Sequence, residues 1–270
     1  MPRNLEEMVV VITGASAGIG AELARQLSQL RAGLVLSARR ADRLNELNAE
    51  LGGRHLVVKS DVSRQDDCEM LIARAVEHFG RIDTLVCNAG YGMARAVAKT
   101  SAEEMLAIFK TNVFGTTDCI RAAVPLMEKQ EPRDGFRGQI MIVSSAAARR
   151  GLPFFGPYSA TKFAQLGLSE ALRVELKPVK IAVTSVHPVG TETEFFKVAE
   201  QQGGLKMPPP GKGEVRQSSE VVARKMIQAI RKPRPEVWPL PPARYLLSFA
   251  TLMPSMGDRI MSKYRGEFDQ

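Results

Sequence analysis

Short apolar runs recur along this chain, and longer stretches with the apolar spacing of helices separate them. Uninterrupted apolar runs of about four to eight residues are typical of strands that are buried on both faces of a parallel sheet. The runs span residues 8–12, 34–38, 55–59, 82–87, 139–143, 179–186 and 236–238. Strands that alternate with helices predict an α/β fold with one doubly wound parallel sheet of about seven strands, flanked by helices.

The stretches between these runs predict helices that end near Leu30 and Phe79, and one long helix from about 102 to 127. A further helix is expected over 219–230. Residues 194–218 lose the helical pattern and are rich in Gly, Pro and Lys. This composition predicts a mobile loop over a binding site.

The 270 residues are 44% hydrophobic and 24% charged, which suits one domain whose core needs no disulfides. We expect residues 1–240 to form this domain and residues 241–270 to extend it as helix. No apolar run reaches the ~18 residues of a membrane span, and no secretory signal pattern opens the sequence, so we expect a cytoplasmic protein. The three cysteines and three histidines lack metal-ligand spacing, which predicts no metal site.

A formal charge of +8 fits nucleic acid, a membrane surface or a polyanionic cofactor. Aromatic residues make up only 6% of the chain and are not interleaved with the basic residues. We therefore do not expect nucleic-acid binding.

A glycine-rich segment joins the first apolar run to the helix that follows it. Glycines stand at Gly14, Gly18 and Gly20. Glycine permits positive φ and close approach of a ligand, and free N–H groups at a helix N-terminus bind a pyrophosphate. The segment therefore predicts a dinucleotide-binding loop, and a purely structural glycine turn is the alternative.

The second apolar run ends in Arg39 and Arg40. In dinucleotide-binding folds an acidic residue here holds the ribose diol, whereas a basic residue accommodates a 2′-phosphate. Asp42 follows three residues after Arg39, where it complements the dipole of the next helix. A charge-assisted contact from Arg39 is worth about 1.5–3 kcal/mol, so we expect NADP(H) to be favoured over NAD(H).

The ends of the next two runs also carry candidate ligand contacts. Asp61 follows the third run, and carboxyl ends of parallel strands face the ligand crevice. Its alternative role is to cap the next helix. The fourth run leads into Asn88-Ala89-Gly90, whose small residues would let a cofactor lie against the backbone.

Tyr158 and Lys162 stand at i and i+4 and therefore project from one face of a helix that Pro157 opens. A free tyrosine has a pKa of about 10, and an ammonium about 4 Å away would lower it by roughly three units. Asn112 lies in an apolar helical stretch, where its amide needs partners. Gly115 indicates close packing or a bend near that residue.

Together these segments, over about residues 8–195, resemble the short-chain dehydrogenase/reductase family, which implies a Rossmann-like fold. Thr13-Gly14-x-x-x-Gly18-x-Gly20 is similar to its cofactor loop, and Asn88-Ala89-Gly90 to its sheet-stabilising motif. The resemblance implies a catalytic tetrad of Asn112, Ser145, Tyr158 and Lys162, with Ser145 preferred over Ser144 because it lies thirteen residues before the tyrosine. The implied cofactor-binding residues are Gly14, Ser16, Gly18, Ile19, Gly20, Arg39, Asp61, Val62, Asn88, Ala89, Gly90, Tyr158, Lys162, Pro188, Val189 and Thr193.

Three positions depart from the family pattern in this part of the chain, and the first, Cys87 where the family often has asparagine, is a common variation. Val189 stands where glycine often follows the proline, and Ala17 stands where many NADP-dependent members carry a basic residue. The preference for NADP(H) therefore depends mainly on Arg39.

The resemblance also implies a mechanism. Ser145 and Tyr158 hold a carbonyl oxygen while hydride passes between the nicotinamide and the carbonyl carbon, and Tyr158 exchanges the proton. Lys162 lowers the pKa of Tyr158 and bonds the nicotinamide ribose, and Asn112 holds a water that links Lys162 to solvent.

An apolar set in the predicted loop and tail suggests a hydrophobic ketone or aldehyde as substrate, of steroid, retinoid, long-chain or acyl type. Its members are Phe195, Phe196, Leu205, Met207, Trp238, Leu240, Tyr245 and Phe249. The same residues could instead complete the core or a subunit interface. An NAD-dependent alcohol dehydrogenase of the same family is the alternative function, and a non-catalytic dinucleotide-binding regulatory protein is the alternative from another class.

The tail from Ala243 to Met253 is apolar to amphipathic, with basic residues around it. We expect it to cover the substrate cleft or to pack across a dimer interface, and peripheral contact with a membrane is the alternative. The family resemblance implies a homodimer or homotetramer.

Overall fold

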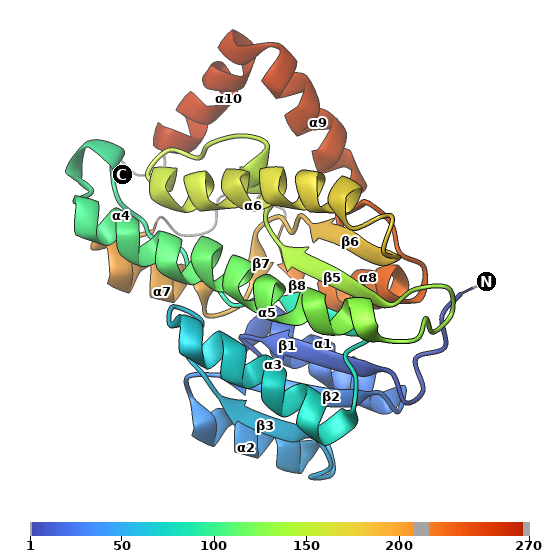
Figure 1. Ribbon diagram of the computed structural model, residues 1–270. Helices are drawn as coiled ribbons and strands as arrows, with labels where there is room; N and C mark the ends of the chain where they lie inside the picture. The colour runs from blue at the N-terminus through green and yellow to red at the C-terminus, as the bar shows by residue number, and fades with distance from the viewer. Residues whose placement is uncertain (1, 208–215, 267–270) are drawn as a thin grey trace.

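The computed structural model describes residues 2–207 and 216–266 (Figure 1). Its centre is a seven-stranded sheet in the order β3-β2-β1-β4-β5-β6-β9, in which all neighbouring strands are parallel. The strands are β1 (Val9–Thr13), β2 (Gly33–Ala38), β3 (Leu56–Lys59), β4 (Thr84–Cys87), β5 (Gly138–Val143), β6 (Ile181–Val186) and β9 (Glu236–Val237). Each of the seven predicted apolar runs coincides with one of these strands to within two residues at either end, and the doubly wound parallel sheet is confirmed.

Helices flank the sheet, and a separate two-stranded sheet pairs β7 (Thr191–Glu192) with β8 (Gln217–Ser218). The α-helices are α1 (Gly18–Gln29), α2 (Ala41–Glu50), α3 (Gln65–Phe79), α4 (Ala102–Phe109), α5 (Gly115–Lys129), α6 (Gly156–Glu175), α7 (Phe195–Gly203), α8 (Ser219–Arg231), α9 (Pro241–Leu252) and α10 (Pro254–Gly266). Three short helical segments are η1 (Val97–Lys99), η2 (Lys110–Phe114) and η3 (Ala146–Ala148).

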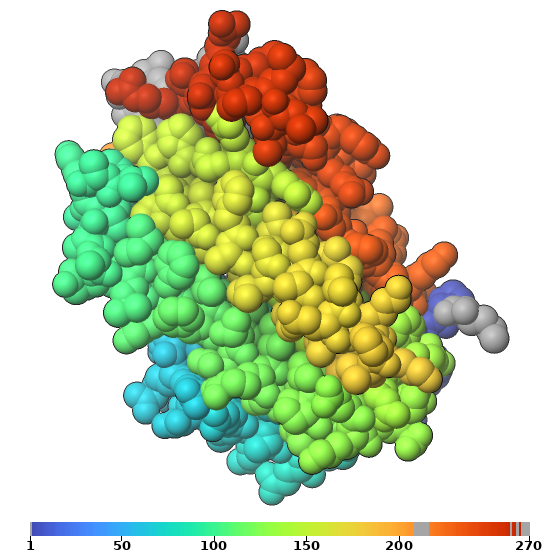
Figure 2. Space-filling view, turned by 45° about the horizontal axis from the view of Figure 1, so that its top comes forward, coloured from blue at the N-terminus to red at the C-terminus, as the bar shows by residue number. Residues whose placement is uncertain are grey.

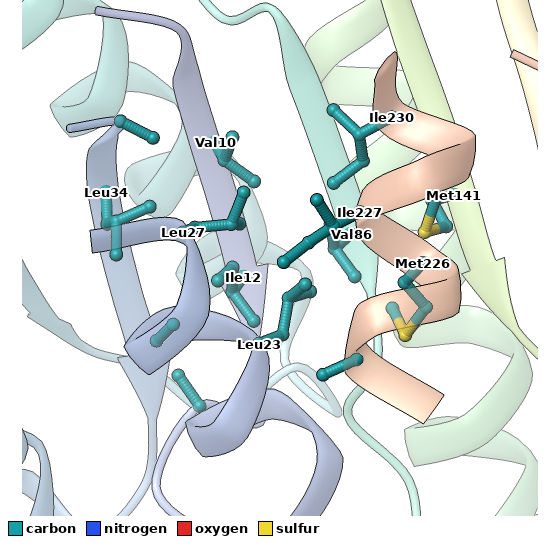
Figure 3. Packing of buried hydrophobic residues seen from close by; sticks show 14 of the residues in the cluster. Val10, Ile12, Leu23, Leu27, Leu34, Val86, Met141, Met226, Ile227 and Ile230 are labelled. Atoms are coloured by element: carbon teal, nitrogen blue, oxygen red, sulfur yellow. The ribbon is translucent and has the colours of Figure 1, made fainter. Parts of the chain in front are cut away.

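Alternation along the strands divides the core into two layers. Val10 and Ile12 of β1 face α1 and α8, where they meet Leu27 and Ile227 (Figure 3). Val11, between them, faces the other side and belongs to a cluster built with α3 and α5. Both faces of the sheet are therefore covered, which is why its strands read as continuous apolar runs rather than as alternating ones.

The chain reverses its direction across the sheet between β1 and β4, because β2 and β3 lie on one side of β1 while β4, β5 and β6 lie on the other. Such a switch point leaves a crevice at the carboxyl ends of the strands, where open α/β sheets bind ligands.

Two sequence-based expectations about helices were wrong. The single helix over 102–127 is divided, because the π-helical segment η2 separates α4 from α5. Residues 195–203 form the helix α7 rather than a loop, since its apolar side packs against the region of Met93 and Tyr158. The predicted loop residues 208–215 lie outside the described part of the chain.

Helices α9 and α10 form an arm at one end of the molecule, which Figure 1 shows at the top and Figure 2 shows as a continuous block of surface above α6. The hydroxyl of Thr251 donates to the carbonyl of Arg149 at 2.9 Å, and Arg150 forms an ion pair with Asp258. Among the described residues, no helix is long and apolar enough to cross a membrane.

Candidate active site

A cleft of about 420 Å³ lies at the switch point, where the carboxyl ends of the central strands meet the helices that follow them. Its lining includes every residue implied above as cofactor-binding except Gly20, and three of the four tetrad residues. These are Gly14, Ser16, Gly18, Ile19, Arg39, Asp61, Val62, Asn88, Ala89, Gly90, Ser145, Tyr158, Lys162, Pro188, Val189 and Thr193. The fold therefore brings together residues that are up to 179 positions apart, from Gly14 to Thr193.

The glycine segment forms a tight turn between β1 and α1. Gly14 and Gly18 have φ of 67° and 56°, a conformation that favours glycine. A Cβ on Gly14 would lie 2.9 Å from the Cα of Ala89, and one on Gly20 would lie 2.6 Å from the amide nitrogen of Asn88. The first turn of α1 has no acidic residue and no side-chain cap, so its N–H groups are oriented to bind an anion.

Asn88 joins this turn to the end of β4. Its side-chain amide donates to the carbonyls of Thr13 at 2.9 Å and of Gly14 at 3.2 Å. The hydroxyl of Thr13 accepts from the backbone N–H groups of Asn88 and Ala89, both at 3.0 Å. These four bonds hold the glycine turn against the sheet.

Basic residues line the edge of the cleft where β2 ends. Arg39 is exposed and lines the cleft. Arg40 and Arg43 both bind the carboxylate of Glu194, at 2.9 and 2.7 Å, and Arg40 also donates to the hydroxyl of Ser16 at 3.2 Å. Two guanidinium groups therefore already hold one carboxylate at this position. The arginines keep the pKa of Glu194 below its usual value through these hydrogen bonds.

Asp61 lies in the cleft but does not cap the next helix, because the N-cap of α3 is Arg64 and no side chain caps that helix. It lines the cleft beside Val62, and its carboxylate accepts from the backbone N–H and the hydroxyl of Ser63, at 3.0 and 2.8 Å. Asp42 lies in the first turn of α2, as expected for an acid that complements the helix dipole.

The two serines after β5 point to different partners. The hydroxyl of Ser144 donates to the backbone carbonyl of Lys162 at 3.1 Å. Ser145 adopts an extended backbone, its hydroxyl accepts from the N–H of Ala147 at 3.1 Å, and its side chain is close enough to Tyr158 to exert a lowering effect on the pKa of the phenol. Ser145 is thus the serine whose hydroxyl adjoins the phenol.

Tyr158 and Lys162 lie on one face of α6, as their spacing predicts, and Pro157 opens that helix. The Lys162 ammonium is 5.5 Å from the centre of the Tyr158 ring. It donates to the carbonyl of Val143 at 2.9 Å and to the side-chain oxygen of Gln165 at 2.8 Å.

Burial changes the acidity of both groups. It raises the pKa of Tyr158 to about 12, against a smaller opposing effect of the Ser145 hydrogen bond. It lowers the pKa of Lys162 to about 7. The expectation that Lys162 lowers the tyrosine pKa is therefore not met in this structure, because desolvation dominates and the ammonium is turned toward Val143 and Gln165.

Asn112 lies in the π-helical segment η2 and is fully buried. Its side-chain amide donates to the carbonyl of Tyr91 and the hydroxyl of Thr161, and its side-chain oxygen accepts from the N–H of Tyr91, all at 3.0 Å. Its backbone carbonyl accepts from Gln165 at 2.6 Å and from Thr116 at 2.9 Å. The amide thus has the partners that its buried position requires, and Gln165 spans the gap between Asn112 and Lys162.

Aromatic side chains close the cleft over Tyr158. The ring of Phe195, the first residue of α7, meets the Tyr158 ring edge to face at 5.0 Å. Phe155 lies 6.3 Å from the same ring. Phe196 also lines the cleft, and Leu205 and Met207 pack against the cluster that contains Tyr158.

The remainder of the predicted apolar set lies elsewhere. Trp238 is buried beside His187, whereas Tyr245 and Phe249 are exposed on α9. Among the described residues none from α9 or α10 lines the cleft. The tail docks instead on the segment that follows Ser145.

Three residues that contact the site did not stand out in the sequence: Gln165, His187 and Glu194. Gln165 follows Lys162 by three residues and could have been found as a polar position on the buried face of α6. Glu194 carries no local signal, because its partners lie about 150 residues earlier in the chain. No group of three metal-ligating side chains is found within the described residues.

Comparison with known proteins identifies the class of molecule that this fold and cleft define. A model of the short chain dehydrogenase family matches residues 8–203. "Uncharacterized oxidoreductase YxnA" of Bacillus subtilis is 31% identical over 97% of this chain and 73% of its own length. "11-beta-hydroxysteroid dehydrogenase-like 3" of Arabidopsis thaliana is 35% identical over 74% of this chain and 65% of that protein.

Among solved structures, a short chain dehydrogenase/reductase from Burkholderia phymatum in complex with NAD superimposes with a TM-score of 0.79. It shares 22% identity and covers 90% of this chain and 92% of its own. The chain therefore belongs to the short-chain dehydrogenase/reductase family and is an oxidoreductase with the NAD(P)-binding fold of that family.

Proposed function

We propose that this oxidoreductase is an NADP(H)-dependent carbonyl reductase that acts on a hydrophobic ketone or aldehyde. The observation that carries the proposal is that the side chains of Ser145 and Tyr158 adjoin each other in the cleft, next to the apolar rings of Phe155 and Phe195. The catalytic residues proposed are Asn112, Ser145, Tyr158 and Lys162.

The residues of the cleft fit a nicotinamide dinucleotide. Side chains at Gly14 and Gly20 would collide with neighbouring atoms, and the N-terminus of α1 has N–H groups available for a pyrophosphate. Asp61 and Asn88 also line the cleft, and Thr193 lies 3.0 Å from the position that a Cβ on Gly18 would take. When bound, the cofactor would supply or accept hydride.

The arginines at the end of β2 support a preference for the phosphorylated cofactor. Arg39 faces the cleft, and Arg40 and Arg43 bind a carboxylate in the manner expected for an anion site. The structural neighbour described above was solved with NAD, so the preference for NADP(H) rests on these side chains of the chain itself.

In the proposed reaction the chain's own residues hold the substrate oxygen and move one proton. Ser145 and Tyr158 donate to the carbonyl oxygen, on which negative charge develops in the transition state. The raised pKa of Tyr158 keeps the phenol protonated at neutral pH, which is the form that reduction requires. In its protonated form Lys162 supplies positive charge close to the tyrosine, and Asn112 with Gln165 orients Lys162.

Phe155, Phe195, Phe196 and Leu152 line the cleft near Tyr158 and support a hydrophobic substrate. The steroid dehydrogenase name of the Arabidopsis relative is in line with a steroid, and a retinoid, long-chain or acyl compound fits the same wall. Oxidation of an alcohol with NAD is the alternative activity. A non-catalytic regulatory protein is the alternative from another class.

The test combines cofactor binding with one substitution. NADPH should bind at least about tenfold more tightly than NADH in a titration followed by nicotinamide fluorescence. Tyr158→Phe should abolish reduction of a panel of hydrophobic ketones and leave NADPH affinity within about twofold. Equal binding of the two cofactors would favour the NAD-dependent alternative, and substantial turnover by Tyr158→Phe would refute the proposed role of the tyrosine.

For the molecule as a whole we propose one catalytic domain over residues 1–240 with residues 241–270 as its extension, a homodimer or homotetramer, and a cytoplasmic location. The exposed apolar side chains of α9 support an interface between copies of the chain. Peripheral contact of the same helix with a membrane is the second candidate, since apolar and basic residues occur together there.

A further inference from the structure

His187 lies directly behind Ser145, at the end of β6, and is fully buried. Its Nδ1 is 3.1 Å from the carbonyl oxygen of Ser145, and its Nε2 is 3.0 Å from the hydroxyl of Ser185. A carbonyl oxygen only accepts, so Nδ1 carries the hydrogen, and the Ser185 hydroxyl donates to Nε2. The neighbouring N–H of Ala146 donates to the carbonyl of Pro188 at 2.9 Å. Two hydrogen bonds in opposite directions therefore fix the backbone on which Ser145 stands.

One face of the imidazole ring packs on the indole of Trp238, with ring centres 4.5 Å apart and planes 14° from parallel. The indole N–H donates to Glu236 at 2.8 Å. That carboxylate also binds Arg149, which follows Ser145 in the chain, at 2.7 Å, and Arg244 at 3.6 Å. Because Arg244 belongs to α9, one side-chain network joins the C-terminal arm to the serine.

The charged groups that face the imidazole are Glu236, Arg149 and Arg244. Burial outweighs the raising effect of the carboxylate and lowers the pKa of His187 to about 4. The ring is therefore neutral at physiological pH, and its single N–H is committed to Ser145.

We propose that His187 is a positioning residue that holds Ser145 in place through its backbone carbonyl, and that Trp238 and Glu236 connect it to α9. The inference rests on the proposed function, because Ser145 is there the residue that binds the substrate oxygen. Through this network the C-terminal arm would help to hold Ser145 in position, although no described residue of α9 or α10 lines the cleft.

The first measurement needs neither cofactor nor substrate. The chain has three histidines, so ¹⁵N spectra of the protein can be assigned to His187 by the signals that His187→Asn removes. We expect the Nδ1–H tautomer at neutral pH. An Nε2–H tautomer would overturn the proposal, whatever the activity of the enzyme.

The second measurement compares two substitutions, with NADPH and the best ketone of a hydrophobic panel. His187→Phe keeps the stack on Trp238 and loses the donor, so kcat should fall about three- to tenfold, with NADPH affinity unchanged. His187→Asn places an amide N–H near the position of Nδ1, so kcat should stay within about twofold of the wild type. Equal losses in both variants, or a wild-type kcat in His187→Phe, would overturn the proposal. Absence of turnover by the wild-type protein would instead refute the proposed function, and the tautomer would still test the network.

Ser185→Ala provides the same comparison if His187→Phe does not fold, because it keeps the ring and removes the group that fixes its tautomer. A lower kcat with unchanged NADPH affinity is expected, and wild-type kcat would count against the proposal.

The connection between His187 and α9 is tested by the fluorescence emission of Trp238, the only tryptophan. Thr251→Val combined with Arg244→Ala should shift this emission, whereas the neighbouring exposed change Leu252→Ala should not. An unshifted emission in the double variant would refute the connection.

Discussion

At the scale of single residues, burial acts on the two ionisable groups of α6 in opposite directions. Desolvation disfavours the charged form of each group, so the Tyr158 pKa rises to about 12 while the Lys162 pKa falls to about 7. Between pH 7 and the usual lysine pKa of 10.5, the unfolded chain binds a proton at Lys162 that the folded chain does not. The contribution of Lys162 to the free energy of unfolding should therefore increase as the pH rises through that window.

Gln165 provides a way to change the charge state of Lys162. Gln165→Glu would place a carboxylate oxygen where the amide oxygen now lies, 2.8 Å from the ammonium, and so raise the lysine pKa. The profile of kcat/KM for NADPH should decline above about pH 7 in the wild type and extend at least about one pH unit higher in this variant. Gln165→Met, which is neutral and of similar size, is the control, and its decline should stay near the wild-type pH. An unshifted profile in Gln165→Glu would show that the ionisation of Lys162 does not cause the decline of kcat/KM above about pH 7.

Glu194 occupies the guanidinium groups that the 2′-phosphate is proposed to use. Glu194→Gln removes the competing negative charge, so NADPH affinity should rise about two- to fivefold while NADH affinity stays constant, since exposed ion pairs contribute up to ~1 kcal/mol. Parallel fluorescence titrations with the two cofactors check this, and Glu192→Gln on the nearby β7 is the control. A fall in NADPH affinity would mean that Glu194 orders the arginines instead of competing for them.

At the scale of elements, the π-helical segment η2 between α4 and α5 could not be predicted from the sequence. Asn112 and Gly115 did indicate an irregularity inside a long helical pattern. The break itself arises because Asn112 bonds Tyr91 and Thr161 from other elements, and because Gly115 packs on Val62 after β3. Such long-range contacts leave no periodic trace, and for the same reason α7 was taken for a loop.

Gly115→Ala tests this contact between α5 and the wall of the cleft. The added Cβ would lie 2.5 Å from the carbonyl oxygen of Val62 and 2.9 Å from its Cβ. We expect a loss of about 1–3 kcal/mol in the free energy of unfolding, as for other overpacked sites, together with weaker NADPH binding because Val62 lines the cleft. Denaturant unfolding and cofactor titration are the measurements.

Gly167→Ala on α6 is the matched control, since no atom lies within 4 Å of the position its Cβ would take. In that helix it should leave stability unchanged or raise it by up to about 1 kcal/mol. If both variants behave alike, the close approach of α5 to Val62 is not what requires the glycine.

At the scale of the whole molecule, the sheet and the cleft were predictable because they depend on local patterns. Continuous apolar runs identified the seven strands, and the glycine turn, Arg39 and the Tyr158–Lys162 pair each lie at the carboxyl end of a strand or at the start of the next helix. The docking of the C-terminal arm depends instead on polar contacts whose partners cannot be predicted from the pattern of residues along the chain. These contacts join Thr251 to Arg149 and Asp258 to Arg150.

Within the described part of the chain, one face of α9 is left exposed. Tyr245, Phe249 and Leu252, at i, i+4 and i+7, are 72%, 46% and 81% exposed, and Leu246 beside them is 56% exposed. A stripe of this kind on a surface helix is typical of an interface. We predict that it pairs with a second copy of the chain. Leu246→Asp combined with Phe249→Asp should then reduce the oligomer mass in light scattering and leave the Thr251 contact with Arg149 in place.

The control is a charge at another exposed apolar position, Val174→Asp at the end of α6, which is 74% exposed and should leave the mass unchanged. Binding to vesicles with anionic lipid distinguishes the other candidate. If the wild type is monomeric and floats with such vesicles while the double variant does not, the stripe contacts a membrane and the prediction of self-association is wrong. If the mass is unchanged by the double variant and the protein binds no vesicles, the stripe contacts neither a second copy of the chain nor a membrane. The dimer prediction holds only where the loss of mass and the retention of the Trp238 emission occur together, because the second observation shows that the arm is still docked.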